Sequence, residues 1–208
     1  MAPPARDFEL VQIVDASLAD AARRAGPMLA CRPGCTQCCY GAFAISQLDV
    51  ERLRAGMNQL RESEPARAAE VERRAQSWID EFGRDFPGHA ATGLLGESRE
   101  DRERFEEFAN DAACPALDPA TGLCDLYAAR PMTCRVFGPP VRVESPVDAD
   151  VESGLGHCEL CFVGATPAEV AACEMTIPHE LEQTLIDELA SSGLRGETVV
   201  AFALLRLD

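Results

Sequence analysis

The sequence predicts a mainly α-helical fold, in which a small single domain over residues 1–208 arranges its helices around an irregular, cysteine-rich centre. Two observations lead to this prediction. Several stretches carry apolar residues at helical spacing, and the segments between them are rich in cysteine, proline and glycine. Apolar residues make up 47% of the chain, which is enough to bury a core without disulfides. At most a short β-hairpin is expected.

The N-terminal half predicts three helices. Apolar residues recur at helical spacing within residues 8–29, where the first helix is expected. A second helix should begin at Ser46, because the S-x-x-D box that Ser46 forms with Asp49 is typical of a helix start. Pro65 suits the first position of a third helix that extends to Phe82.

The C-terminal half predicts shorter elements. A strongly charged helix over about 98–112 should expose much of its surface, and the apolar C-terminal segment should pack on the core. The other expectations are a loop over 83–97, a helical turn near 125–129, a short strand over 141–144, an irregular segment over 154–161, and helices over about 167–175 and 179–191.

The charge balance excludes several classes of partner. Acidic residues outnumber basic ones 35 to 19, giving a formal net charge of -16. Neutralising phosphates requires a basic face, so we expect neither nucleic-acid nor anionic-membrane binding. The apolar stretches are too short for a membrane span, and the N-terminus lacks the pattern of a secretory signal. We therefore expect a cytoplasmic protein, in whose reducing environment clustered cysteines favour metal sites over disulfides.

The chain contains ten cysteines, and four of them fall within the run C-R-P-G-C-T-Q-C-C at 31–39. Thiolates are soft ligands that suit zinc, copper(I) and iron–sulfur clusters. Two pairs have the C-x2-C spacing that aims both sulfurs at one ion: Cys35 with Cys38, and Cys158 with Cys161. The adjacent Cys38 and Cys39 are unusual for a simple four-cysteine zinc site, because successive side chains diverge, so Cys39 is a candidate for a second metal or a neighbouring site. The density and spacing of the cysteines predict a metal-binding centre.

A second cysteine segment, residues 114–138, carries Cys114, Cys124 and Cys134 between stiffening prolines. Arg130 and Arg135 lie close to Cys134 in sequence. A four-thiolate zinc site and a four-thiolate [4Fe–4S]²⁺ cluster both carry a formal charge of minus two, and guanidinium groups would stabilise either. Zinc, iron and an iron–sulfur cluster therefore all stay open as cofactors.

These motifs resemble those of a known family. The run C-R-P-G-C-T-Q-C-C, followed by C-P-A-L-D and by G-L-C-D-L-Y-A-A-R-P-M-T-C-R, is similar to the CxxCxxCC cysteine-cluster family, also labelled YkgJ-like, a zinc- or iron-chelating domain. The resemblance covers about 31–161. One departure is that three residues, not two, separate Cys31 from Cys35. The resemblance implies that the metal ligands are Cys35, Cys38, Cys39, Cys114, Cys124 and Cys134, with Cys158 joining them.

The full set of candidate ligands is wider than this implied set. Cys173 lies in a helical pattern and is expected in the core, His157 is a lesser ligand candidate, and Tyr127 is expected to pack over the site. The candidate metal ligands are Cys31, Cys35, Cys38, Cys39, Cys114, Cys124, Cys134, Cys158 and Cys161.

Three functions follow as hypotheses. The first is a metal-binding protein that chelates zinc or iron, with an iron–sulfur cluster as one form, for structure, storage or delivery. The second is a metal- or cluster-dependent enzyme, either redox-active or similar to the flagellin lysine N-methylases that some family members resemble. The third is a disulfide-stapled domain. The sequence contains no nucleotide-binding or metalloprotease motif that would specify catalysis, and it points to a metal ion rather than a particular protein as partner.

Overall fold

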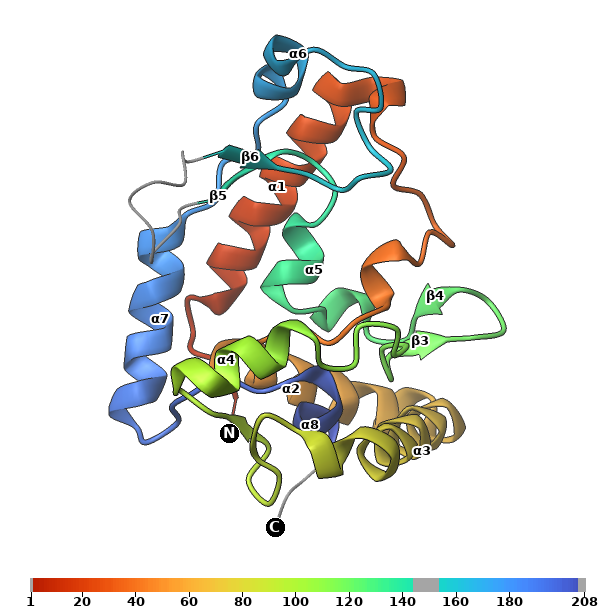
Figure 1. The fold of residues 1–208 in the computed structure, drawn as a ribbon, viewed down its shortest axis with the longest axis vertical. Helices are drawn as coiled ribbons and strands as arrows, with labels where there is room; N and C mark the ends of the chain where they lie inside the picture. Colours follow the sequence, from red (N-terminus) through yellow and green to blue (C-terminus); the bar gives the residue numbers. More distant parts are fainter. Residues whose placement is uncertain (1, 144–153, 206–208) are drawn as a thin grey trace. The chain divides into compact units, whose positions relative to one another are not determined.

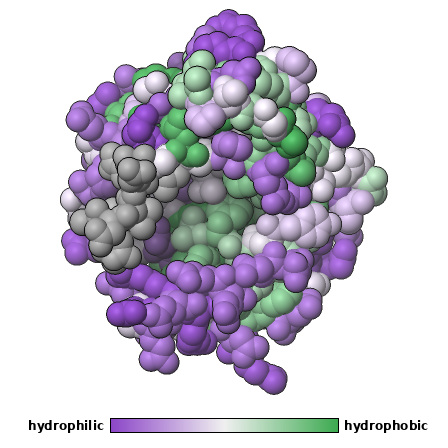
Figure 2. All heavy atoms as spheres, turned by 45° about the horizontal axis from the view of Figure 1, so that its top comes forward, coloured by the Kyte–Doolittle hydropathy of each residue, from purple (hydrophilic) through white to green (hydrophobic). Residues whose placement is uncertain are grey.

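A computed structural model describes residues 2–143 and 154–205 (Figure 1). The described residues divide into two compact units. Residues 2–4, 33–132 and 185–205 form the first unit, and residues 5–32, 133–143 and 154–184 form the second. Whether these units make the single domain expected from the sequence stays a prediction. Hydrophilic residues cover much of the face shown in Figure 2, in keeping with the acidic composition.

The first unit is built on three helices that pack on one another, α2 (Gln47–Ser63), α3 (Pro65–Phe82) and α8 (Val200–Leu204) (Figure 1). The predicted capping box is present, because the Ser46 side chain accepts from the Asp49 backbone N–H while the Asp49 side chain accepts from that of Ser46. Pro65 begins α3 as predicted. The other elements of this unit are 3₁₀ turns at Gln37–Cys39, Gly83–Asp85 and Tyr127–Ala129, strands β1 (Gly88–His89), β2 (Leu94–Leu95), β3 (Leu117–Asp118) and β4 (Leu123–Cys124), and helix α4 (Arg99–Glu106).

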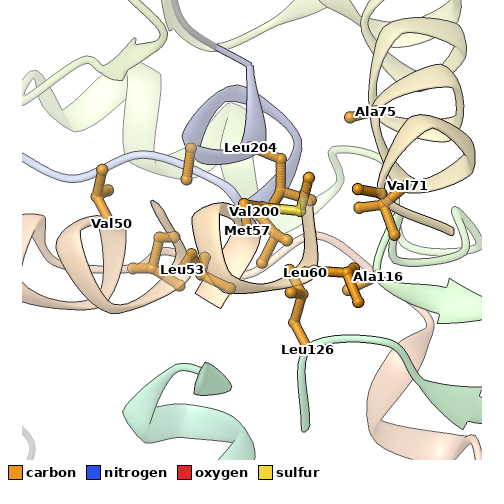
Figure 3. Packing of buried hydrophobic residues seen from close by; sticks show 13 residues of the cluster. Val50, Leu53, Met57, Leu60, Val71, Ala75, Ala116, Leu126, Val200 and Leu204 are labelled. Atoms are coloured by element: carbon orange, nitrogen blue, oxygen red, sulfur yellow. The ribbon is translucent and has the colours of Figure 1, made fainter. Parts of the chain in front are cut away.

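Two apolar clusters form the core of the first unit. One joins α2, α3 and α8 through residues such as Leu53, Val71 and Val200 (Figure 3), which confirms that the apolar C-terminal segment packs on the core. The other is aromatic: Trp78, Phe86, Phe108 and Phe202 contact one another with ring centroids 4.7–5.8 Å apart. These clusters give the unit a hydrophobic core.

The second unit contains α1 (Asp7–Ala25), a 3₁₀ turn (Gly26–Met28), most of α5 (Met132–Val136), β5 (Val141–Val143), β6 (Gly154–Gly156), α6 (Pro167–Ala172) and the first half of α7 (His179–Ser191). Arg135 is buried at 2% exposure, and its Nη1 donates to both carboxylate oxygens of Asp15 on α1. Thr166 and Glu169 form a second capping box at the start of α6.

The mainly helical class is confirmed, while the strands are more numerous than expected but only two or three residues long each. The strands that the structure describes pair as β1–β2, β3–β4 and β5–β6, all antiparallel. Residues 154–156, expected to be irregular, form β6 because they pair with the predicted strand at 141–143; Glu144 lies outside the described residues. The short helix α5 was also not predicted.

The prediction of a charged helix over about 98–112 is wrong about the helix end, because the helix is shorter. Helix α4 ends at Glu106 and, as predicted, buries none of its residues. Ala109 then takes a left-handed conformation with φ of 52°, and its carbonyl accepts from the N–H groups of Ala42 and Ala112. Pairing with the segment that follows Cys39 thus replaces helix with turns. No helix in the part of the chain that the structure describes is long and apolar enough to cross a membrane.

Candidate metal centre

The β3–β4 hairpin is fixed to the helical core of the first unit. Ala116 and Leu126, which follow Cys114 and Cys124 by two residues, point into the apolar cluster beside Leu60 and Val71 (Figure 3). Both cysteines themselves pack against this cluster. The core therefore holds each cysteine through an apolar residue two positions away.

Backbone hydrogen bonds then aim the two sulfurs. Leu117 pairs with Cys124 across the hairpin, and the Asp125 N–H donates to the Ala116 carbonyl over 2.8 Å. The Cys114 sulfur accepts from the N–H groups of Ala116 and Leu117, and the Cys124 sulfur accepts from that of Leu126. Amides at the second and third positions after a cysteine orient its sulfur and stabilise negative charge on it, as second-shell groups of thiolate sites do.

The first cysteine segment is bonded to the second along the backbone. The Cys114 N–H donates to the Cys39 carbonyl over 2.7 Å, and the Gly41 N–H to the Ala112 carbonyl over 2.9 Å. Cys38 and Cys39 lie in a 3₁₀ turn closed by a bond from the Cys39 N–H to Thr36. Two sequence-distant cysteine segments are thereby fixed side by side.

The loop that carries Cys35 contacts the tip of the hairpin. A Cβ atom built on Gly122 would lie 3.6 Å from both Gly34 and Thr36, the neighbours of Cys35. Gly122 has φ of 71°, which the tight hairpin turn requires. Cys35 is half-buried and joins the same part of the first unit.

Cys38 and Cys39 share a proton. The Cys39 S–H bonded to Cys38 lowers the pKa of Cys38 to about 6, with Arg130 contributing and burial opposing, and the same bond raises the pKa of Cys39. The hydrogen bond therefore favours the thiolate of Cys38 over that of Cys39. Because only a thiolate is a strong nucleophile or metal ligand, Cys38 is the thiol of this pair that converts to the binding form more readily.

The pKa values of the other two thiols are raised. Burial raises the pKa of Cys114 to about 12, despite its two backbone donors. Burial also raises the pKa of Cys124, with the Asp125 carboxylate adding to the effect and Arg130 opposing it. Charge on Cys38 raises both pKa values, and charge on Cys114 and Cys124 raises that of Cys39. Four thiols whose charges repel in this way form a donor set that a cation would stabilise.

Three arginines and one aspartate support this donor set. The Asp125 side chain is 2% exposed and pairs with Arg67 and Arg74 of α3, while Arg74 Nε also donates to the Pro115 carbonyl over 2.8 Å. Sequence reasoning did not single out these three residues, although Asp125 directly follows a candidate ligand. Arg130, predicted near the site, acts on Cys38 and Cys124 and lies 4.0 Å from the centroid of the Tyr127 ring. The Tyr127 ring is exposed and stacks on Arg130, which differs from packing over the sulfurs.

The remaining sequence candidates belong to the second unit. Cys134 is half-buried on α5, Cys31 is exposed, and Cys158 and Cys161 are buried with Cys173 in one apolar cluster. Cys173 is 2% exposed, as its predicted place in the core requires. His157 Nδ1 lies 3.0 Å from the Cys158 carbonyl oxygen, and its ring contacts Phe162. That Cys31, Cys134, Cys158 and Cys161 are metal ligands stays a prediction.

The thiols are not yet arranged as a finished coordination shell. Among residues 2–143 and 154–205, no group of three or more His, Cys, Asp or Glu side chains is placed to hold a metal ion as the chain stands. All ten cysteines lie within this described part and are thiols, with none joined in a disulfide. Ion binding at Cys38, Cys39, Cys114 and Cys124 would have to draw the sulfurs together, as is usual where binding and local folding are coupled.

The fold and this donor set define a helical protein with a thiol-rich centre of the kind that chelates soft or borderline metal ions. The profile of the family CxxCxxCC, described as "Putative zinc- or iron-chelating domain", matches residues 30–145, more than half of the 208 residues. The chain belongs to this family, and the resemblance read from its motifs is confirmed. The match ends before residue 161, where the resemblance was expected to end, and therefore does not include Cys158. Neither the curated proteins nor the solved structures include a match to the chain.

Proposed function

We propose that this protein binds a single Zn²⁺ or iron ion through the thiolates of Cys38, Cys39, Cys114 and Cys124, with Zn²⁺ as the favoured ion. The family description supports metal binding in general. The specific ligand assignment is supported by the backbone pairing that places the turn of Cys38 and Cys39 beside the hairpin of Cys114 and Cys124, whose sulfurs accept from backbone N–H groups.

The spacing of the Cys38–Cys39 pair favours one ion over a cluster. A tetrahedral ion with metal–sulfur bonds of about 2.3 Å holds its sulfurs about 3.8 Å apart, close to the separation of two hydrogen-bonded sulfurs. The thiols of Cys38 and Cys39 are hydrogen-bonded. In a [4Fe–4S] cluster each thiolate binds a different iron, which spaces the cysteine sulfurs more widely.

The ion would supply positive charge that links the turn of Cys38 and Cys39 to the hairpin of Cys114 and Cys124. Residues of the chain favour ion binding there in three ways. Cys38 provides the first thiolate, and the backbone amides after Cys114 and Cys124 favour their deprotonation against burial. Arg130 offsets part of the negative charge of the finished site, because its guanidinium lies near Cys38 and Cys124. Asp125, held by two arginines of α3, fixes the hairpin that carries Cys124.

The direct test is the metal content of the full chain purified anaerobically from cells. Zinc bound at whole-number stoichiometry in a colourless protein supports the proposal, and iron without acid-labile sulfide supports its iron form. A brown protein with iron and acid-labile sulfide would contradict the single-ion site. A folded, reduced protein that neither contains nor takes up metal would refute metal binding altogether.

Substitutions test the ligand assignment. Cys38→Ser, Cys114→Ser and Cys124→Ser should each lower bound metal by about one ion per chain, because three thiolates leave a tetrahedral site incomplete. Leu123→Ser is the matched control, since Leu123 precedes Cys124 in β4 and its side chain is 44% exposed. Equal metal loss in the control, or full retention in the three cysteine variants, would show that these thiols are not the ligands.

A further inference from the structure

The second unit contains a thiol cluster of its own. Cys158, Cys161 and Cys173 are 6%, 1% and 2% exposed and belong to one cluster with Ala25 and Phe162. All three lie beyond residue 145, where the family match ends. Buried thiols can serve as small apolar side chains, so burial alone does not make them ligands. The local backbone supplies the further argument.

Cys158 and Cys161 occupy a tight turn of the kind that places two sulfurs on one ion. The Cys161 N–H donates to the Cys158 carbonyl over 2.9 Å, which closes the C-x2-C turn. The next residue, Phe162, has φ of 57°, an uncommon conformation for a bulky side chain. A bond of 2.8 Å from the Phe162 N–H to the Met28 carbonyl holds it there. Strained backbone kept beside two cysteines indicates a functional constraint on their direction.

Two further cysteines come from other segments. Cys173 is the C-cap residue of α6 and belongs to the same buried cluster as Cys158 and Cys161. Cys31 lies beside Gly138: a Cβ atom built there would be 2.6 Å from the Cys31 sulfur. The Gly138 carbonyl accepts from the Cys158 N–H over 3.2 Å. Gly138 thus brings Cys31 next to Cys158, and the exposure of Cys31 leaves an approach from solvent.

We propose that Cys31, Cys158, Cys161 and Cys173 form a second, closed metal site that holds a Zn²⁺-type ion independently of the first. Four thiolates complete a tetrahedral shell without an open position, and the apolar surroundings of three of them keep water away. This shell differs from the sequence expectations in two ways, because Cys158 was expected to join the ligands of the CxxCxxCC motif and Cys173 was expected only in the core. Among residues 2–143 and 154–205 no three His, Cys, Asp or Glu side chains are already grouped to hold an ion, so these four sulfurs, like those of the first site, would have to close around it on binding.

Metal counting on matched variants tests this site separately from the first. The reduced wild-type chain should bind two zinc ions, while Cys161→Ser and Cys173→Ser should each bind one. Val170→Ala is the control for packing, because Val170 contacts the same apolar cluster without a thiol, and it should keep both ions. Cys38→Ser should also bind one ion, and its combination with Cys161→Ser none. If only the first site is wrong, Cys38→Ser will bind as much as wild type while Cys161→Ser still loses its ion.

Alkylation mass spectrometry on the unmodified chain covers the case in which a variant fails to fold. With zinc bound, Cys31, Cys158, Cys161 and Cys173 should resist alkylation, and a chelator should expose all four in one step. Protection of the three buried cysteines that persists after metal removal would mean ordinary core packing and overturn the proposal. A mass lower by two hydrogens in the protein purified without reductant, with a disulfide among these four, would overturn it equally.

Discussion

Replacing Asp125 by Asn tests whether the hairpin that carries Cys124 is held from α3. The Asp125 side chain is 2% exposed, and its two oxygens pair separately with Arg67, 39% exposed, and Arg74, 17% exposed. The amide keeps the size of the side chain but removes its charge, which leaves two guanidinium groups with a weaker acceptor.

The magnitude follows from the burial of the partners. Breaking a fully buried ion pair costs about 3–5 kcal/mol, and an exposed pair contributes about 0–1 kcal/mol. Because Arg67 is partly solvated and Arg74 is mostly buried, we expect the free energy of unfolding to fall by about 2 kcal/mol. With a urea m-value of about 2 kcal/mol/M, the unfolding midpoint should fall by about 1 M. Groups that orient metal ligands typically change metal affinity by about 10- to 100-fold, so zinc affinity should fall within that range.

The assays are urea unfolding of the metal-free chain, followed by fluorescence of Trp78, and zinc competition with a chromophoric chelator. Trp78 is the single tryptophan and lies in the core of the first unit. Glu70→Gln is the matched control, because Glu70 pairs with Arg73 on the same helix at the exposed surface, and it should change neither measurement. A normal zinc affinity in a destabilised Asp125→Asn protein would refute the positioning role, and an unchanged midpoint would refute the argument from burial.

Three further predictions concern the same unit. Removing the metal should leave most far-ultraviolet circular dichroism intact, because the buried residues that join α2, α3 and α8 include none of the proposed ligands. Hydrogen exchange should rise over 34–42 and 113–126, and global unfolding would contradict this prediction. In the metal-free chain the alkylation rate of Cys38 should fall as the pH drops through about 6, because the lowered pKa of Cys38 keeps its thiolate present above that pH. Cys39→Ala removes the S–H donor and should move this midpoint to higher pH. A midpoint that does not move would exclude the hydrogen bond between the two thiols as the cause. Ser46→Ala should lower the free energy of unfolding by about 1 kcal/mol through loss of the α2 cap, again measured with Trp78, and an unaltered midpoint would count against it.

Local chemistry explains which elements could be predicted from the sequence. A capping box, a proline at the first helical position and apolar residues at helical spacing act within a few residues, so α2 and α3 begin where their sequences indicate. The end of α4 could not be predicted in this way. The segment after Glu106 is shaped by hydrogen bonds to residues 41 and 42, which lie far away in the chain.

The same distinction applies to the cysteines. Their number, chemistry and motif spacing are properties of the sequence, and they sufficed to indicate a thiolate metal centre and its family. The grouping of the thiols depends on long-range backbone bonds, such as that from Cys114 to Cys39, and on burial. Folding also creates the hydrogen bond between Cys38 and Cys39 and the ion pairs of Asp125 with Arg67 and Arg74. These interactions depend on burial and on side chains that only the tertiary structure brings together.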